Sequence, residues 1–226
     1  WSSDVCSSDL VTARDLFPLF PRRPRDAHKG RYGHALLVGG AEGYSGAIGL
    51  AARAAVRSGA GLTSVITPAS VAPAAAAGCP EAMVTAARQT ETGSLSSEDE
   101  ATWTGRLKAA DAILAGPGMT AHEDTGRIVQ QLLRTCRAPL VLDADALNAF
   151  AGRIEALREA TAPVVLTPHP GEMARLLGSS PAEIQQDRFG AARVAAAKAG
   201  ATVVLKGAGT IVTREGGPLM VNGTGN

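Results

Sequence analysis

The sequence predicts an α/β protein with a mostly parallel central sheet that helices cover on both faces. Short apolar runs alternate with stretches of helical length along most of the chain. The apolar runs are continuous, which is typical of strands buried on both faces of a parallel sheet. Five of these runs end directly in a glycine-rich or polar cluster, as strands of an open parallel sheet do at their ligand-binding edge.

The expected strands are residues 35–38, 62–67, 81–85, 112–115, 140–142, 164–166 and 202–205, with a closing β-pair at 211–213 and 219–221. The expected helices are residues 45–58, 97–109, 125–136 and 180–199. Ser97 and Glu100 form a capping-box pair for the second of these helices. Ser180, Pro181 and Glu183 supply an N-cap, an N1 proline and a capping-box acid for the last. The alanine-rich residues 69–79 fit either state.

Residues 1–24 are expected to be a leader and linker outside the fold, which we place at 25–226. The leader WSSDVCSSDL is no secretory signal, because it lacks a basic start and acidic residues interrupt it. Residues 18–30 carry three prolines and an arginine cluster, Arg22, Arg23 and Arg25. A solvated linker and a basic docking patch both fit this segment. No composition break divides the rest, and the closing Gly/Asn-rich loop is expected to lead into a further segment.

Composition excludes several classes of protein. The 22 Lys+Arg against 21 Asp+Glu give a net charge of +1, so no overall field attracts nucleic acid. Aromatic residues are 4% of the chain, too few for base-stacking platforms. No apolar run approaches the roughly 18 residues of a membrane helix. Three cysteines without a CxxC pair, Cys6, Cys79 and Cys136, indicate reduced thiols of a cytosolic protein.

The first three of the five clusters carry glycines or acidic residues. The first, Gly39–Gly49, has no clean GxGxxG and no Walker A pattern, yet its glycines and the following helix suit either an anion or a plain turn. Gly116-Pro117-Gly118 permits close approach of a ligand. Asp143 and Asp145 lie two apart at a strand end and point the same way by alternation. They fit Mg²⁺ or a substrate hydroxyl, while Asp145 also fits an N-cap.

The other two clusters carry cationic and titratable groups. His169-Pro170-Gly171-Glu172 places an imidazole and a carboxylate at the start of a helix, where Glu172 is favoured by the helix dipole in any case. Lys206 to Thr210 combine a cation, two glycines and a hydroxyl, the parts of a phosphate-binding loop. A turn histidine and a solvated lysine beside a β-turn are the alternatives.

Together these motifs resemble the ADP- or ATP-dependent NAD(P)H-hydrate dehydratases, a family of the ribokinase-like three-layer αβα fold. The similarity covers about residues 25–226. The segments that carry it are HKGRYGHALLVGGAEGYSGA (28–47), RSGAGL (57–62), AGPGM (115–119), VLDADALN (141–148), LTPHPGE (166–172), LKGAGT (205–210) and NGTGN (222–226).

The resemblance implies repair of NADHX and NADPHX, the hydrated forms of the nicotinamide cofactors. A nucleotide phosphorylates the hydroxyl of the hydrate, phosphate leaves, and the dihydronicotinamide is restored. The chain looks more like the bacterial members, which use ADP and release AMP and phosphate, than like the ATP-dependent eukaryotic ones. Magnesium and a fused or separate hydrate epimerase are further expectations of the family. The oligomeric state stays open.

The resemblance also assigns roles to residues. Ala47, Gly118 and His169 match hydrate-binding positions. Lys206, Gly207, Ala208, Gly209 and Thr210 match the loop that holds the AMP portion. Glu172 takes the place of the acid that orders Mg²⁺ through water, and Asp143 and Asp145 receive a supporting role.

The family's catalytic base is an Asp in a GGTGD-like segment that follows the NGTGN stretch. It is expected beyond Asn226, so this chain by itself is expected to be inactive. A vitamin-precursor kinase of the same fold and a non-catalytic nucleotide-binding module are the alternatives. A Rossmann oxidoreductase is disfavoured, because no acidic residue follows the first glycine loop at the required spacing.

Overall fold

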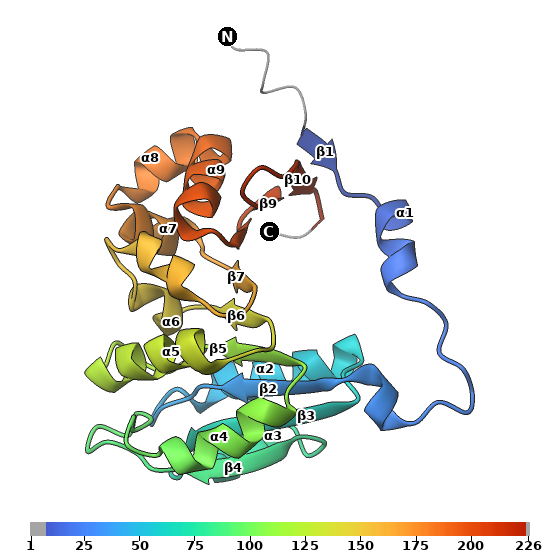
Figure 1. The fold of residues 1–226 in the computed structure, drawn as a ribbon, viewed down its shortest axis with the longest axis vertical. Coiled ribbons are helices and arrows are strands. Elements are labelled where there is room, and N and C mark those ends of the chain that lie inside the picture. Colours follow the sequence, from blue (N-terminus) through green and yellow to red (C-terminus); the bar gives the residue numbers. More distant parts are fainter. Residues whose placement is uncertain (1–7, 225–226) are drawn as a thin grey trace. The chain divides into compact units, whose positions relative to one another are not determined.

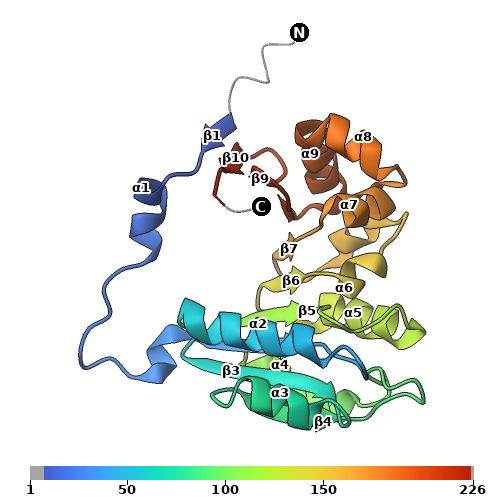
Figure 2. The ribbon, with the colours of Figure 1, turned by 180° about the vertical axis from the view of Figure 1, so that it is seen from behind.

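The computed structural model describes residues 8–224, which divide into two compact units. Unit A contains residues 28–149 and 159–164. Unit B contains residues 8–27, 150–158 and 165–224. Figures 1 and 2 show the helices and strands of each unit from opposite sides. We describe the two units separately.

Unit A contains a parallel sheet with the strand order β6-β5-β2-β3-β4. Its strands are β2 (His34–Val38), β3 (Leu62–Pro68), β4 (Met83–Ala87), β5 (Ala112–Ala115) and β6 (Leu140–Leu142). Val38 at the carboxyl end of β2 pairs with Ile66 on one side and with Ala115 on the other. This register sets the glycine clusters after β2 and β5 next to each other.

Helices cover both faces of the unit A sheet (Figures 1 and 2). The pair α2 (Ser45–Ser58) and α3 (Ala72–Gly78) lies on one face, and the pair α4 (Glu100–Ala109) and α5 (Glu123–Thr135) lies on the other. The short helices η3 (Lys29–Tyr32) and α6 (Asp145–Asn148) precede β2 and follow β6. The core under α2 and α3 consists of Leu37, Ile48, Ala52, Val65, Val71, Ala75 and Cys79.

Unit B contains a mixed sheet with the strand order β1-β10-β9-β8-β7, in which β9 is antiparallel to both of its neighbours. Its strands are β1 (Ser8–Leu10), β7 (Val164–Leu166), β8 (Thr202–Leu205), β9 (Thr210–Thr213) and β10 (Leu219–Asn222). Its helices are α1 (Ala13–Leu16), η2 (Phe17–Leu19), η4 (Ile154–Glu159), α7 (Pro170–Leu177), α8 (Pro181–Gln186) and α9 (Arg188–Ala199). Small buried side chains let α9 pack closely on β8 and β9, namely Ala192, Ala195, Ala196 and Ala199.

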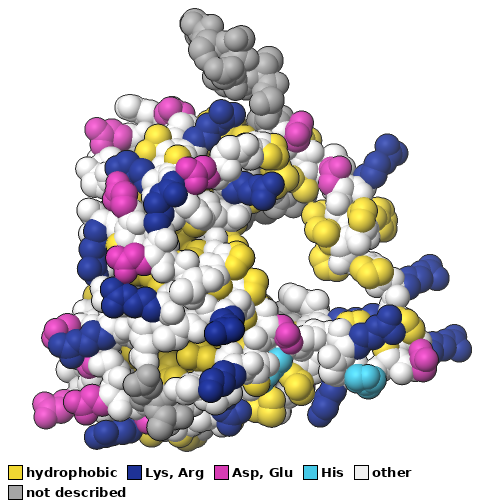
Figure 3. Space-filling model, viewed as in Figure 1, with side chains coloured by type: hydrophobic (Ala, Val, Ile, Leu, Met, Phe, Trp, Pro, Cys, Tyr) yellow, Lys and Arg dark blue, Asp and Glu magenta, His cyan; other side chains and the backbone are white. Residues whose placement is uncertain are grey.

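All of the strands predicted within residues 35–221 are present, with ends shifted by at most a few residues, and the alanine-rich segment forms α3. Residues 8–10 of the expected leader pair with β10 as β1, so the expectation that residues 1–24 lie outside the fold does not hold for them, while residues 1–7 lie outside the described residues. The segment after β1 exposes apolar side chains over α1 and η2 (Figure 3), among them Phe17 and Phe20. Residues 21–26 are exposed and lie outside helices and strands, as both interpretations of the arginine cluster require.

The single helix expected over residues 180–199 is wrong, because the structure contains two. Ser180 and Glu183 form the expected capping box at the start of α8. Asp187 then leaves the helical region with φ −139° and ψ 76°, and its side chain accepts a hydrogen bond from the Gly190 N–H at 2.8 Å. An internal Asp can therefore end one helix and cap the next.

The capping box expected at Ser97 is also wrong, because α4 begins at Glu100 with Asp99 as its N-cap. The Ser97 N–H and hydroxyl instead donate to Asp124 Oδ1 in the first turn of α5. Burial by itself raises the pKa of Asp124. The hydrogen bonds from Ser97, with His122 and Arg127 nearby, outweigh this and lower the pKa below its ordinary value.

Asp124 is therefore expected to stabilise the fold in a pH-dependent way. A lowered pKa gives stability that is complete above the unfolded value of about 3.9 and is lost as the pH falls through the folded value. We expect Asp124→Asn to lose about 1–2 kcal/mol of unfolding free energy at neutral pH and to approach the wild type near pH 3. Urea unfolding at both pH values measures this, with exposed Glu123→Gln as the control. A deficit of equal size at both pH values would contradict the expectation.

Within residues 8–224, no helix is long and apolar enough to cross a membrane.

Candidate functional site

The first glycine loop follows β2 in unit A, and packing accounts for its first two glycines. A Cβ on Gly39 would lie 2.5 Å from the Pro117 carbonyl oxygen, and one on Gly40 would lie 2.6 Å from Thr67 Oγ1. Gly40 also has φ +84°, which favours glycine. By contrast, a Cβ on Gly46 in the first turn of α2 would meet nothing within 4 Å. Close packing and backbone conformation therefore explain the glycines at positions 39 and 40. They do not explain the small residues in the first turn of α2.

The cluster after β5 joins this loop directly. Gly40 N–H donates to the Pro117 carbonyl at 2.8 Å. Gly118, with φ +67°, lies so close to α2 that a Cβ on it would be 2.8 Å from the Tyr44 carbonyl and 3.5 Å from the Ala47 Cβ. Ala47 is exposed in the first turn of α2. The structure therefore brings together Ala47 and Gly118, two of the three positions expected to bind the hydrate.

Contrary to the interpretations from sequence, the two aspartates after β6 are not related by the alternation of a strand, and Asp145 is not an N-cap. Ala144 between them has φ +49° and ψ −115°, so the alternation of a strand does not continue to Asp145. Asp145 is the first residue of α6 and not its N-cap. Its carboxylate accepts the Thr120 N–H at 2.8 Å and lies 3.3 Å from Asn148 Nδ2. Asp145 thus fixes the loop after β5, in which Thr120 has the uncommon φ of +66°.

In unit B, His169 is the N-cap of α7 and Glu172 completes a capping box. The His169 Nδ1 accepts from the Gly171 N–H at 3.0 Å, so the proton of the neutral ring is on Nε2. Glu172 Oε2 accepts the His169 backbone N–H at 2.7 Å, and its Oε1 is 3.4 Å from the ring Nε2. Glu172 is 5% exposed. His169 is therefore a capping residue, and its half-exposed ring presents an N–H beside a buried carboxylate.

Lys206 ties the last cluster to the capping box. Its backbone N–H donates to the Pro168 carbonyl at 2.9 Å, and its Nζ lies 3.7 Å from Glu172 Oε2. The lysine is thus paired with a buried carboxylate and is not a plain solvated side chain. Thr210 Oγ1 donates to the Gly207 carbonyl at 3.0 Å and closes the loop. Unit B therefore gathers His169, Glu172 and the loop of residues 206–210.

Sequence reasoning missed Arg188, the first residue of α9. Its Nη1 donates to the Ala208 carbonyl at 2.6 Å, and its Nη2 lies 3.3 Å from the carbonyls of Leu205 and Lys206. The nearest signal in the sequence is Asp187, which marks a helix start within the predicted helix. That signal places Arg188 in a first helical turn, but only the fold brings it to the loop.

Glu172 is the residue expected to act on Mg²⁺. Both of its carboxylate oxygens already face donors, and residues 8–224 contain no cluster of three or more His, Cys, Asp or Glu side chains that could hold a metal. Direct ligation does not fit this arrangement, whereas a contact through water to a nucleotide-bound ion is compatible with it. Cys79 and Cys136 are free and buried, and burial raises the pKa of the Cys136 thiol to about 11.

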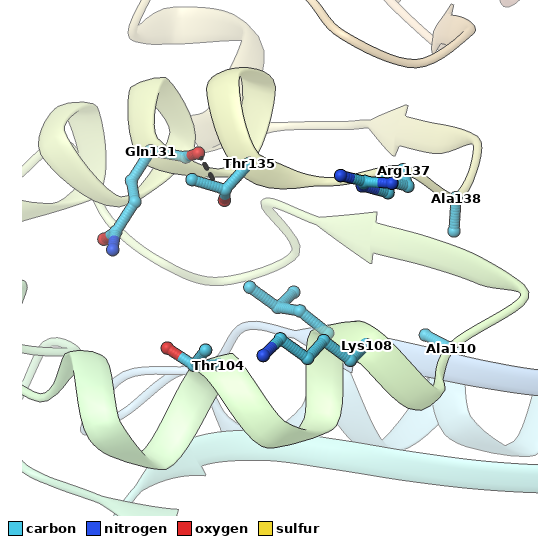
Figure 4. A pocket seen from close by; sticks show the side chains of 8 residues that line it. Thr104, Lys108, Ala110, Gln131, Thr135, Arg137 and Ala138 are labelled. Carbon is cyan, nitrogen blue, oxygen red and sulfur yellow. Dashed lines mark hydrogen bonds between the residues drawn. The ribbon is translucent and has the colours of Figure 1, made fainter.

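A pocket of about 590 Å³ lies elsewhere in unit A, between α4 and α5 (Figure 4). Ala110 and Ala138 lie just before β5 and β6, so the pocket is at the amino ends of these strands. Lys108 and Arg137 line it, and Thr135 Oγ1 donates to the Gln131 carbonyl at 2.8 Å. The residues indicated by the sequence follow the carboxyl ends and take no part in it.

The strand order, the helices and the loops after the strands define a ribokinase-like α/β protein. A ribokinase-like protein of Enterococcus faecalis superposes with a TM-score of 0.78 at 30% identity, covering 97% of this chain and 72% of that one. An ADP/ATP-dependent NAD(P)H-hydrate dehydratase of Bacillus subtilis, co-crystallised with ATP and Mg²⁺, gives 0.80 at 32% identity, covering 98% and 74%.

The family profile of NAD(P)H-hydrate dehydratases matches residues 35–226, and this chain belongs to that family. A bifunctional NAD(P)H-hydrate repair enzyme of Moorella thermoacetica is 42% identical over 217 residues, covering 96% of this chain. That of Escherichia coli is 39% identical over 209 residues, covering 92%. The chain spans about two-fifths of the length of these relatives, 41% and 37%. The expected family and fold are thereby confirmed.

Proposed function

We propose that this chain is the dehydratase part of an NAD(P)H-hydrate repair enzyme that uses ADP as the phosphoryl donor. The observation that carries the proposal is the arrangement in unit B, where Lys206 and the two glycines of its loop stand beside a buried Glu172. A cation next to a glycine-rich backbone suits a nucleotide phosphate. Ala47 and Gly118, which lie together in unit A, have the small size that the approach of a bulky dinucleotide requires.

The proposed reaction has two steps. The bond from the β-phosphorus to the AMP oxygen breaks while a bond to the hydroxyl oxygen of the hydrate forms, and the hydroxyl proton leaves to a base. The phosphate then leaves with its C–O electron pair, and loss of a ring proton restores the dihydronicotinamide. Phosphoryl transfer depends mainly on positioning and on neutralising charge. Magnesium would supply part of that neutralisation, with Glu172 as an outer contact through water.

Within this proposal Lys206 binds the nucleotide, and the loop backbone orients it. His169 presents its ring N–H to the hydrate, while Asp143 and Asp145 act in support; the contact of Asp145 with Thr120 gives it a positioning role. ADP is preferred to ATP on the resemblance to bacterial members alone.

Calorimetric titration of the chain with ADP and with ATP, each with Mg²⁺, tests the proposal. Lys206→Ala should weaken binding about tenfold to a hundredfold, because it removes a charge-assisted contact to phosphate. Lys198→Ala is the matched control, since this exposed lysine pairs with Glu155 at 2.8 Å in the same unit. Equal affinity of the wild type and Lys206→Ala would contradict the assignment of this loop.

Incubation with NADHX, ADP and Mg²⁺ distinguishes the alternative functions. Recovery of the dihydronicotinamide absorbance with release of phosphate would support a dehydratase. A stable phosphorylated product would point to a kinase of the same fold. A version extended beyond Asn226 that binds ADP but never turns over would point to a non-catalytic binding module.

A further inference from the structure

We propose that Arg188 is a positioning residue that sets the backbone of residues 205–208 so that the loop can bind a phosphate group of the nucleotide. The proposal rests on the proposed function of this loop. Arg188 lies in unit B at the start of α9, and its guanidinium reaches three carbonyls of one short segment. One planar, permanently charged group thus holds the end of β8 and the loop after it.

The direction of these carbonyls decides where the loop N–H groups point. In a trans peptide the C=O and the next N–H point in opposite directions. The Lys206 carbonyl faces Arg188, so the Gly207 N–H points away from it. The Ala208 carbonyl also faces Arg188, so the Gly209 N–H points away as well. Two N–H groups directed to the same side of a loop are the elements of an anion-binding concavity.

Gly207, which lies between these carbonyls, leaves room for the guanidinium of Arg188. Gly207 has φ +141°, and a Cβ on it would lie 2.9 Å from Arg188 Nη2 and 3.2 Å from Cζ. A side chain at this position would push the guanidinium off the loop. The glycine therefore serves the contact with Arg188 in addition to any contact with a ligand, which explains why a small residue is needed here.

The helix cap at Asp187 sets the position of Arg188, and one nitrogen of the arginine side chain has no hydrogen-bond partner in the described part of the chain. Asp187 caps α9, accepting from the Gly190 N–H, and so fixes the first turn from which the arginine extends. Among the described residues, nothing bonds to Arg188 Nε, although this atom is buried. A buried donor without a partner costs free energy. If this arginine served stability alone, its Nε–H would be expected to have a hydrogen-bond acceptor. An arginine that orders a binding loop can leave the Nε–H without an acceptor, because its other nitrogens hold the loop.

The test compares Arg188→Lys and Arg188→Met with Arg193→Met, which removes an exposed arginine from the same helix. Binding of ADP and of ATP is measured by calorimetry, amide exchange of residues 207–210 by NMR on the unliganded chain, and the unfolding midpoint by circular dichroism. We expect about tenfold weaker binding for Arg188→Lys and about tenfold to a hundredfold for Arg188→Met. Both should exchange their loop amides faster, and Arg193→Met should match the wild type.

Folded Arg188 variants that bind nucleotide and exchange like the wild type would overturn the proposal. A lower unfolding midpoint without a change in loop exchange would also overturn it, because that result marks a purely structural role. If Arg188→Met fails to fold, Arg188→Lys decides, since it keeps the charge and loses the forked contact. A wild-type chain that binds no nucleotide would refute the proposed function instead, and the exchange data alone would then support or overturn the ordering of the loop by Arg188.

Discussion

Gly116→Ala is expected to destabilise the protein by about 3–5 kcal/mol, which is a large part of the stability of an ordinary domain. Gly116 directly follows β5 in unit A, and its φ of +125° is one that residues with a side chain rarely adopt. A Cβ there would lie 1.7 Å from the carbonyl oxygen of Asp143 and 2.8 Å from the Ala146 Cβ. The first contact is with backbone, so no side-chain rotation relieves it.

Relief would require the end of β6 to move away from β5. That movement would break the hydrogen bond from the Asp143 N–H to the Ala115 carbonyl, 3.1 Å long, which joins the two strand ends. The same movement would displace Asp145, whose carboxylate accepts a hydrogen bond from the Thr120 N–H, and so would disturb the loop that contains Thr120. The substitution should therefore lower stability and disturb the loop that carries Gly118.

Gly126→Ala is the matched control for this substitution. Gly126 lies inside α5 in the same unit, and a Cβ on it would meet nothing within 4 Å. Alanine there should raise stability by about 0.5–1 kcal/mol, the ordinary helix preference over glycine. Urea unfolding followed by circular dichroism measures both variants. A Gly116→Ala protein as stable as the wild type would show that the two strand ends are not packed as described.

The strands were predictable because each is a short apolar run bounded by glycine or polar residues. The prediction fails where one residue type can serve two structures. Asp187 lies inside a predicted helix, but its side chain caps the start of α9. Ser97 fits the pattern of an N-cap, but its N–H and hydroxyl donate to Asp124, far along the chain. The strand β1 could not be expected from three residues of a polar leader, since its pairing partner β10 lies at the other end of the chain.

The sequence indicates the loops of the candidate site but not their contacts. Glycines and polar residues mark residues 116–118 and 206–210 as candidate segments, and the structure places these segments directly after β5 and β8. The pairing of Lys206 with Glu172, however, depends on the parallel neighbours β7 and β8, which bring residues 34 positions apart into contact. Arg188 gave no signal of its own, because the partners of an arginine are set by tertiary structure and not by local pattern.

Glu172→Ala is expected to cost about 2–4 kcal/mol of unfolding free energy. The substitution leaves the His169 backbone N–H without its acceptor at the start of α7. It also removes the carboxylate that faces Lys206 Nζ and the His169 ring, and it empties space around a residue that is 5% exposed. Glu172→Gln should lose less, because an amide oxygen can still accept the His169 N–H although the charge beside Lys206 is gone.

A second capping box in the same unit gives the control. Glu183 occupies the same N3 position in α8 as Glu172 in α7, and both helices begin with proline. Glu183 accepts the Ser180 N–H at 2.8 Å but is exposed and pairs with no cation among the described residues. Glu183→Ala should therefore cost clearly less than Glu172→Ala. Equal losses would mean that Glu172 is only a cap, whereas a larger loss at Glu172 would show that its burial beside Lys206 is part of what holds the loop.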